Sequence, residues 1–235
     1  MGLKDSYDIL NKLGDGAFSN VFLAVHRITK VNVAINLNFI KIINFNIIKY
    51  SDFIREVQIL RSLNHPNIVK FFEYFEDDSN FYIVQELCEN GNAAQYIMEY
   101  GPSESPEIKR IFLQLINALQ YLHEVASVLH CDIKAENILL DNNNNVKLAD
   151  FGFSYDQKNN DEINQEFSKK IKGSPAYISP EILLGDNNSI KSDIWSSGIF
   201  LYYLLTGSLP FDDDEIDGLI HCIVQMKPTF PSYLS

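Results

Sequence analysis

The sequence lacks any excess of basic residues, since 19 Lys and Arg face 31 Asp and Glu and leave a net charge of −12. A protein that binds nucleic acid over a broad face needs clustered positive charge to neutralise phosphates. Local basic clusters, such as the lysine-rich run at 169–172, are the exceptions left open. The charge balance therefore argues against nucleic acid as a partner.

Cysteine is also scarce. Cys88, Cys131 and Cys222 are odd in number, widely spaced and without a CxxC pair. This pattern suggests neither a disulfide framework nor a zinc site. Long apolar runs are missing as well, so we expect neither a secretory signal nor a membrane span. Together these absences point to a reducing, cytoplasmic compartment.

Hydrophobic residues make up 46% of the 235 residues, which is enough for one large globular domain or two small lobes. Alternating apolar residues dominate the first 43 positions and favour β-hairpins. Beyond Gly91, apolar residues recur at helical spacing instead. We expect strands within 21–25, 31–35, 68–74 and 81–87, and helices within 51–63, 106–125 and 192–206.

The run at 128–140, with Asp150-Phe151-Gly152 after it, contains the groups that phosphoryl transfer needs. Asp132 can orient a hydroxyl nucleophile and accept its proton, and Lys134 can hold the transferring phosphoryl group. Asn137 and Asp150 can bind the Mg²⁺ that bridges the phosphates of a nucleotide. The alternative is that both aspartates are solvated loop residues, but each follows an apolar run, where unpaired charge is costly.

A glycine-containing turn lies between the first two expected strands and includes Leu13, Gly14 and Gly16. Such a turn can lie flat over nucleotide phosphates, because glycine lets backbone amides approach closely. Ser19 replaces a third glycine, and an ordinary hairpin is the alternative. Glu56, on the helix expected at 51–63, is either the partner of a phosphate-binding lysine or a solvated helix charge.

Taken together, these motifs resemble those of eukaryotic protein kinases over almost the whole chain. The resemblance also covers His65-Pro66-Asn67, Ser179-Pro180-Glu181 and Asp193-Ile194-Trp195-Ser196-Ser197-Gly198. Lys134 and the segment 173–177 are similar to the serine/threonine branch, and 204–212 is similar to the calmodulin-dependent and AMP-activated kinase group. The resemblance implies an α+β, two-lobed fold with a small β-rich N-lobe and a mainly helical C-lobe that lacks its last helices.

The resemblance further implies one kinase domain over 1–235, incomplete at its C-terminus. Its N-lobe would span about 7–87, its hinge about 86–91 and its C-lobe about 92–235. ATP and Mg²⁺ would be its cofactors, a protein or peptide its substrate, and a partner would cover the exposed C-lobe surface. The implied function is a serine/threonine kinase; the alternative is a nucleotide-binding pseudokinase or interaction module with little phosphotransfer.

The resemblance also supplies a nucleotide pocket. Glu86 and Cys88 would present hinge backbone groups to adenine, while Val21, Ala34 and Leu139 would enclose the base as apolar walls. Leu13, Gly14 and Gly16 would cover the phosphates, and Asn137 and Asp150 would be the metal ligands.

One position departs from the family pattern. The lysine expected after Val33-Ala34-Ile35 is Asn36, and an amide cannot supply positive charge to phosphates. Lys41 is the other candidate for this role. A displacement of five residues reverses the face of a strand, so Lys41 would need a bulge at 36–38 to reach the same side.

A second departure is Cys131, which stands where most relatives have an arginine that contacts a phosphorylated activation loop. Lys169 and Lys170 occupy positions where similar kinases carry a phosphorylatable threonine, and Ser168 is the nearest hydroxyl. We therefore hypothesise that this loop is not switched by ordinary phosphorylation.

Overall fold

The computed structural model describes residues 2–15, 19–39, 50–77, 80–158 and 173–234. Backbone packing divides the chain into two compact units. Unit 1 combines Met1–Asn64 with Val69–Glu89, and unit 2 combines His65–Ile68 with Asn90–Ser235. The predictions for Gly16, Lys41, Ser168, Lys169 and Lys170 concern residues outside the described ones.

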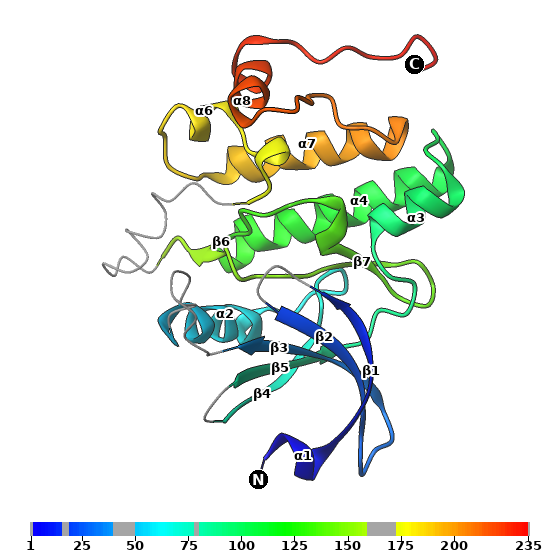
Figure 1. The fold of residues 1–235 in the computed structure, drawn as a ribbon, viewed down its shortest axis with the longest axis vertical. Helices are drawn as coiled ribbons and strands as arrows, with labels where there is room; N and C mark the ends of the chain where they lie inside the picture. The colour runs from blue at the N-terminus through cyan, green and yellow to red at the C-terminus, as the bar shows by residue number, and fades with distance from the viewer. Residues whose placement is uncertain (1, 16–18, 40–49, 78–79, 159–172, 235) are drawn as a thin grey trace. The chain divides into compact units, whose positions relative to one another are not determined.

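Unit 1 contains a five-stranded antiparallel sheet with the strand order β1-β2-β3-β5-β4 (Figure 1). A four-residue helix, α1 (Leu3–Ser6), precedes the sheet. One face buries Ala24, Val33, Ile35 and Val84, as the alternating pattern predicted. The strands are β1 (Tyr7–Asp15), β2 (Ser19–His26), β3 (Asn32–Phe39), β4 (Phe71–Glu76) and β5 (Asn80–Glu86).

Helix α2 (Tyr50–Ser62) packs in unit 1 and confirms the helix expected at 51–63. Phe53, Val57 and Leu60 are buried at helical spacing, which gives the helix an apolar stripe. The ring of Phe53 stacks on Phe81 of β5, with centroids 4.2 Å apart and an interplanar angle of 11°. This aromatic pair attaches the helix to the sheet.

The strand expected at 68–74 was wrong at its start. Ile68 forms an isolated bridge with Leu148, and β4 begins only at Phe71. The Asn67 side chain donates to the Val146 carbonyl at 3.0 Å, and the Leu148 N–H donates to the Asn67 carbonyl at 2.9 Å. These bonds make residues 65–68 part of unit 2.

Unit 2 is mainly helical, and α4 runs beside α7 (Figure 1). The helix expected at 106–125 is α-helical only to Gln120 and continues as a π-helix over Tyr121–Ala126. The helices are α3 (Ala93–Tyr100), α4 (Pro106–Gln120), α6 (Pro180–Leu183), α7 (Ile190–Thr206) and α8 (Ile216–Gln225). Two strand pairs join β6 (Val128–Leu129) to β9 (Tyr155–Asp156), and β7 (Ile138–Leu140) to β8 (Val146–Leu148). Short 3₁₀ turns cover Ala135–Asn137 and Pro175–Tyr177.

Helix α7 positions the site described below. It ends at Thr206 and is capped by Gly207, whose positive φ of 73° suits glycine and whose N–H donates to the Tyr203 carbonyl at 2.8 Å. Its inward side buries Asp193, while Ile190 and Ile194 stay exposed on the outer side. The expected partner for that outer surface stays a prediction. None of the helices in the described segments is both long and apolar enough to cross a bilayer.

Candidate active site

The backbone of the loop that follows β6 is anchored by a single carboxylate. Asp193 of α7 accepts the backbone N–H of His130 at 2.9 Å and that of Cys131 at 2.9 Å. Nε2 of His123 lies 2.8 Å from the same carboxylate. Asp193 is 1% exposed, so these bonds form in a dry environment. They fix the backbone immediately before Asp132.

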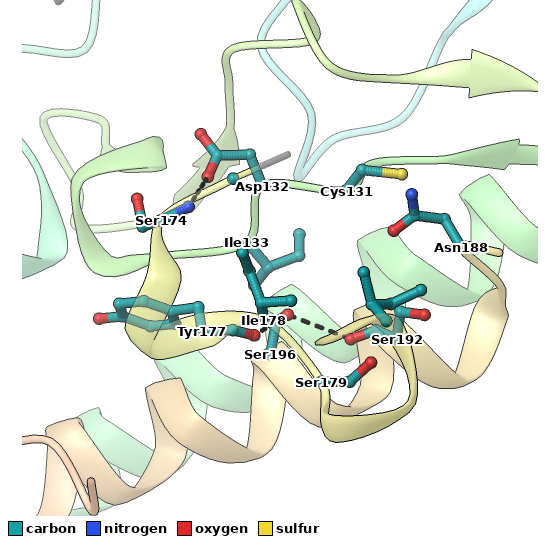
Figure 2. A pocket seen from close by; sticks show the side chains of 12 residues that line it. Cys131, Asp132, Ile133, Ser174, Tyr177, Ile178, Ser179, Asn188, Ser192 and Ser196 are labelled. Carbon is teal, nitrogen blue, oxygen red and sulfur yellow. Dashed lines mark hydrogen bonds between the residues drawn. The ribbon is translucent and has the colours of Figure 1, made fainter. Parts of the chain in front are cut away.

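Asp132 is a buried carboxylate held on three sides. Its Oδ2 lies 2.8 Å from Lys134 Nζ and accepts Asn137 Nδ2 at 2.9 Å. Its Oδ1 accepts the backbone N–H of Ser174 at 3.2 Å (Figure 2). Because the residue is only 3% exposed, the lysine charge and these hydrogen bonds offset the cost of burying it. The result is a fixed acceptor for a proton.

Gly173 brings Ser174 within reach of Asp132. Its φ of 94° lies in the region that favours glycine, and a Cβ there would lie 2.9 Å from the Cys131 carbonyl oxygen. Next to this contact lies a cavity of about 10 Å³, which has room for roughly one water molecule. Figure 2 shows residues of the loop, of the segment 174–179 and of α7 around it. Such a cavity is too small for a substrate.

Asp150 follows β8 and is tied to the same loop, because the Ala149 N–H donates to the Asn137 carbonyl at 2.9 Å. It has a φ of 63°, and Oδ1 accepts the Gly152 N–H at 3.3 Å. The residue keeps surface open to solvent, yet the surrounding protein desolvates its carboxyl group. That desolvation, and then the like charge of Asp132, raises the pKa of Asp150.

The donor set at Asn137 and Asp150 fits a magnesium ion. The Asn137 amide nitrogen donates to the backbone carbonyl and to the carboxylate of Asp132, which leaves Asn137 Oδ1 as an oxygen ligand. A cation would also relieve the like charges that raise the pKa of Asp150. Within the described residues, no three His, Cys, Asp or Glu gather as a cage. An ion here would take its other ligands from phosphates and water, as Mg²⁺ commonly does.

The residues predicted to hold the nucleotide in unit 1 lie on adjacent strands. Gly14 of β1 pairs with Val21 of β2, and Ala34 of β3 pairs with Leu23. Leu13 precedes Gly14 on β1. Glu86, at the end of β5, donates its N–H to the Lys70 carbonyl at 2.9 Å and accepts the Lys70 N–H at 2.7 Å through Oε1. Cys88 follows and is half-buried.

Asn36 lies within β3, opposite Val21 on one side and Ile83 on the other. Its Oδ1 is buried and has no hydrogen-bond partner among the described residues. Glu56 lies on α2, as predicted. The assignment of Asn36 or Lys41 to the position that pairs with Glu56 and binds the phosphates stays a prediction.

The structure thus brings Asp132, Lys134, Asn137 and Asp150 together within unit 2, and Leu139 lies nearby on β7, bridged to Asn92. The sequence pattern did not reveal the anchoring role of Asp193, although the Asp193-Ile194-Trp195 motif marked the position. Nor did it reveal that the Ser174 amide completes the set around Asp132. The glycine before Ser174 was the available signal.

Comparison with known proteins places these residues in context. The protein kinase domain family matches residues 7–232. The SNF1-related protein kinase catalytic subunit alpha KIN12 of Arabidopsis thaliana is 40% identical over 232 residues, 98% of this chain and 45% of that protein. Serine/threonine protein kinases OSK3 and OSK4 of Oryza sativa are each 39% identical, with 44% of their length covered. This chain spans less than half the length of these relatives. It belongs to the protein kinase family.

Proposed function

We propose that residues 1–235 form one catalytic domain that transfers the γ-phosphate of ATP to serine or threonine hydroxyls of proteins. The relatives named as serine/threonine kinases support this branch. The observation that carries the proposal is the buried Asp132 carboxylate, held by Lys134, Asn137 and the Ser174 amide. A fixed, buried acceptor beside a lysine is what the transfer of a phosphoryl group to a hydroxyl needs.

In the proposed reaction, Asp132 accepts a hydrogen bond from the substrate hydroxyl and takes its proton as the oxygen attacks phosphorus. Lys134 stays beside Asp132 and donates to the transferring phosphoryl group, which lowers the cost of the charge that develops there. Asn137 and Asp150 would hold Mg²⁺, which would neutralise the negative charge of the phosphate oxygens. ADP leaves with the electron pair of the broken P–O bond.

For the nucleotide, we propose that Glu86 and Cys88 present backbone groups to adenine. Val21, Ala34 and Leu139 contact its faces, and Leu13, Gly14 and Gly16 cover the phosphates. Glu56 would orient the phosphate-binding residue of the N-lobe. We also propose a cytoplasmic location, because the three cysteines are widely spaced and include no CxxC pair, which suits a reducing compartment.

Radiolabelled phosphate transfer to a serine-containing peptide tests the proposal. Asp132→Asn keeps the shape of the side chain but removes the base, so we expect a rate loss of about 10²- to 10⁴-fold with nucleotide binding retained. Asp212→Asn, at an exposed position, is the matched control and should leave the rate unchanged. Equal rates for the parent chain and Asp132→Asn would overturn the proposal.

A second candidate is a nucleotide-binding protein with little phosphotransfer. Asn36 favours it, because this residue supplies no positive charge and its buried oxygen has no partner within the described part of the chain. The same assay separates the two candidates: a background rate in the parent chain, with nucleotide bound, would support the second.

A further inference from the structure

Asn90 and Gly91 form an asparagine–glycine pair, and no other asparagine of the sequence precedes a glycine. The pair lies at the start of unit 2, just before α3. In such a pair the glycine nitrogen can attack the side-chain carbonyl carbon of the asparagine, because no Cβ stands in the way. Whether this reaction proceeds depends on how the fold holds the two residues.

The attacking nitrogen is not engaged by the fold. The Gly91 N–H donates to no acceptor in the part of the chain that the structure describes. The asparagines at 142–145 differ in this respect. The N–H groups that follow three of them donate to Asp141 at 2.8 to 2.9 Å, and the Val146 N–H donates to Gln114 Oε1 at 2.7 Å. Each of those nitrogens must lose a hydrogen bond before it can react, whereas the Gly91 nitrogen need not.

The carbonyl carbon under attack is open to solvent. Asn90 is exposed and lines a cavity of about 150 Å³, which has room for several water molecules. Water is the second reactant, because it opens the ring that the attack forms. The site therefore supplies both the nucleophile and the water that the conversion needs.

One hydrogen bond restrains the Asn90 side chain. Asn90 Nδ2 donates to Asn144 Oδ1 at 2.7 Å. Asn144 is itself held, since Arg110 Nη2 donates to its carbonyl at 2.8 Å and its φ is 59°. The carboxamide must leave Asn144 before its carbon can turn toward the Gly91 nitrogen. Because the bond is exposed, it slows this movement without preventing it.

We propose that Asn90 is a modification site, at which its own backbone converts the asparagine into aspartate and isoaspartate. The Gly91 nitrogen bonds to the side-chain carbonyl carbon of Asn90, and the side-chain nitrogen leaves as ammonia with the proton of the Gly91 N–H. Water then adds to either carbonyl of the resulting succinimide and breaks one of its two C–N bonds. No oxidant, nucleotide or enzyme takes part, so the reaction stands apart from the role of Asp132.

The two products differ in their effect on β7. The Asn90 N–H donates to the Leu140 carbonyl at 3.1 Å, and the Leu140 N–H donates to the Gly91 carbonyl at 2.9 Å. Isoaspartate adds one methylene to the backbone between these two groups, so both bonds cannot keep their present geometry. Aspartate leaves the backbone length unchanged. Isoaspartate therefore loosens the end of β7, next to Leu139.

Peptide mapping by mass spectrometry tests the proposal on the parent chain after incubation in mildly alkaline buffer. We expect Asn90 to convert at least about tenfold faster than any asparagine at 142–145, since only Asn90 has a glycine and an unengaged N–H after it. An isoaspartyl methyltransferase should label the product. If Asn90 converts no faster than those asparagines, the proposal is overturned. Aspartate without isoaspartate also overturns it, because direct hydrolysis forms no succinimide.

Asn144→Gly tests the restraint, because it removes the acceptor and suits the positive φ of this position. We expect Asn90 to convert about two- to tenfold faster in this variant, as the loss of one exposed hydrogen bond implies. Asn142→Gly is the matched control, since it places a glycine in the same turn at an exposed residue. It should convert at the parent rate. Equal rates in Asn144→Gly and the parent would overturn the restraining role of Asn144.

Hydrogen exchange separates the effects of the two products. The incubated chain, which contains isoaspartate, should exchange the amide hydrogens of 138–140 faster than the fresh chain. Asn90→Asp, which reproduces the other product, should exchange them like the fresh parent chain. Equal exchange in the incubated and fresh chains would overturn the effect on β7.

Discussion

The carboxylate of Asp193 accepts the backbone N–H of His130 at 2.9 Å across 63 residues of sequence. The same carboxylate accepts the N–H of Cys131, which has a φ of 65°. A non-glycine residue rarely adopts that conformation unless surrounding bonds enforce it. Helix α7 therefore holds a strained backbone next to Asp132, and the position of the proposed base depends on a residue outside its own loop.

Asp193→Asn should destabilise the protein. An asparagine side chain offers one acceptor oxygen, so at least one of the N–H groups of His130 and Cys131 loses a good partner. The expected loss in the free energy of unfolding is about 1–3 kcal/mol, the cost of an unsatisfied buried donor. Urea titration measures it, with the exposed Asp212→Asn as control. A variant as stable as the parent would contradict the anchoring role.

Gly173→Ala should disturb the contact between Ser174 and Asp132. The added Cβ would meet the Cys131 carbonyl oxygen at 2.9 Å and Asp132 Oδ1 at 3.3 Å, at a φ of 94°. We expect phosphate transfer to fall about tenfold or more as the base shifts, since small displacements from reactive geometry are costly. The measurement is the rate of phosphate transfer at saturating peptide.

Gly185→Ala is the matched control for this change. Gly185 also has a positive φ, of 102°, but a Cβ there would meet nothing within 4 Å. Both variants therefore introduce similar backbone strain, of roughly 1–3 kcal/mol, and only Gly173→Ala introduces the collision. Equal rates in the two variants would show that the close approach to Asp132 has no effect on transfer.

The fold was largely predictable because its signals are local. The spacing of apolar residues located α2 and α7 to within two residues of their ends, and the order of motifs indicated the kinase family. The bridge between Ile68 and Leu148 was not predictable, because no local pattern reports pairing across 80 residues. Residues 142–145 are four asparagines, a composition that reports no tertiary contact, so the hydrogen bonds from Arg110 to this turn were not predictable.

The residue types of the site were predictable from the sequence, but the contacts that hold these residues in place were less so. Asp132 and Asn137 followed from their spacing, and the structure joins them by a hydrogen bond of 2.9 Å. The positive φ of Cys131 and Asp150 could not be inferred, because neither residue is a glycine that would mark such a conformation. These backbone conformations are enforced by tertiary hydrogen bonds, which no local sequence pattern indicates.

The raised pKa of Asp150 predicts how nucleotide binding responds to acid. A raised pKa means that Asp150 takes up a proton at a higher pH than an ordinary aspartate, so Mg²⁺-dependent binding should be lost as pH falls through that raised value. Asp132→Asn removes the like charge that contributes to the shift. We expect the midpoint of binding of a fluorescent ATP analogue to move to lower pH in this variant. Midpoints that coincide would contradict the coupling of the two carboxyl groups.

Asn36→Lys tests whether β3 contains the phosphate-binding position. If Asn36 occupies it, the new lysine supplies the missing positive charge, and the rate of phosphate transfer at saturating ATP should rise about tenfold or more. If Lys41 already supplies that charge, Asn36→Lys should leave the rate unchanged or lower it. Lys41→Ala completes the comparison, since it should matter only in the second case.

Asn36→Leu separates the charge from the packing of this position. The leucine removes the buried Oδ1 that has no partner among the described residues, so the free energy of unfolding should rise by about 1 kcal/mol. It adds no charge, so phosphate transfer should stay at the parent rate. If phosphate transfer is faster in both Asn36→Leu and Asn36→Lys, the gain comes from stability. If it is faster in Asn36→Lys alone, the gain comes from the positive charge, and Asn36 is then the reason that the parent enzyme is slow.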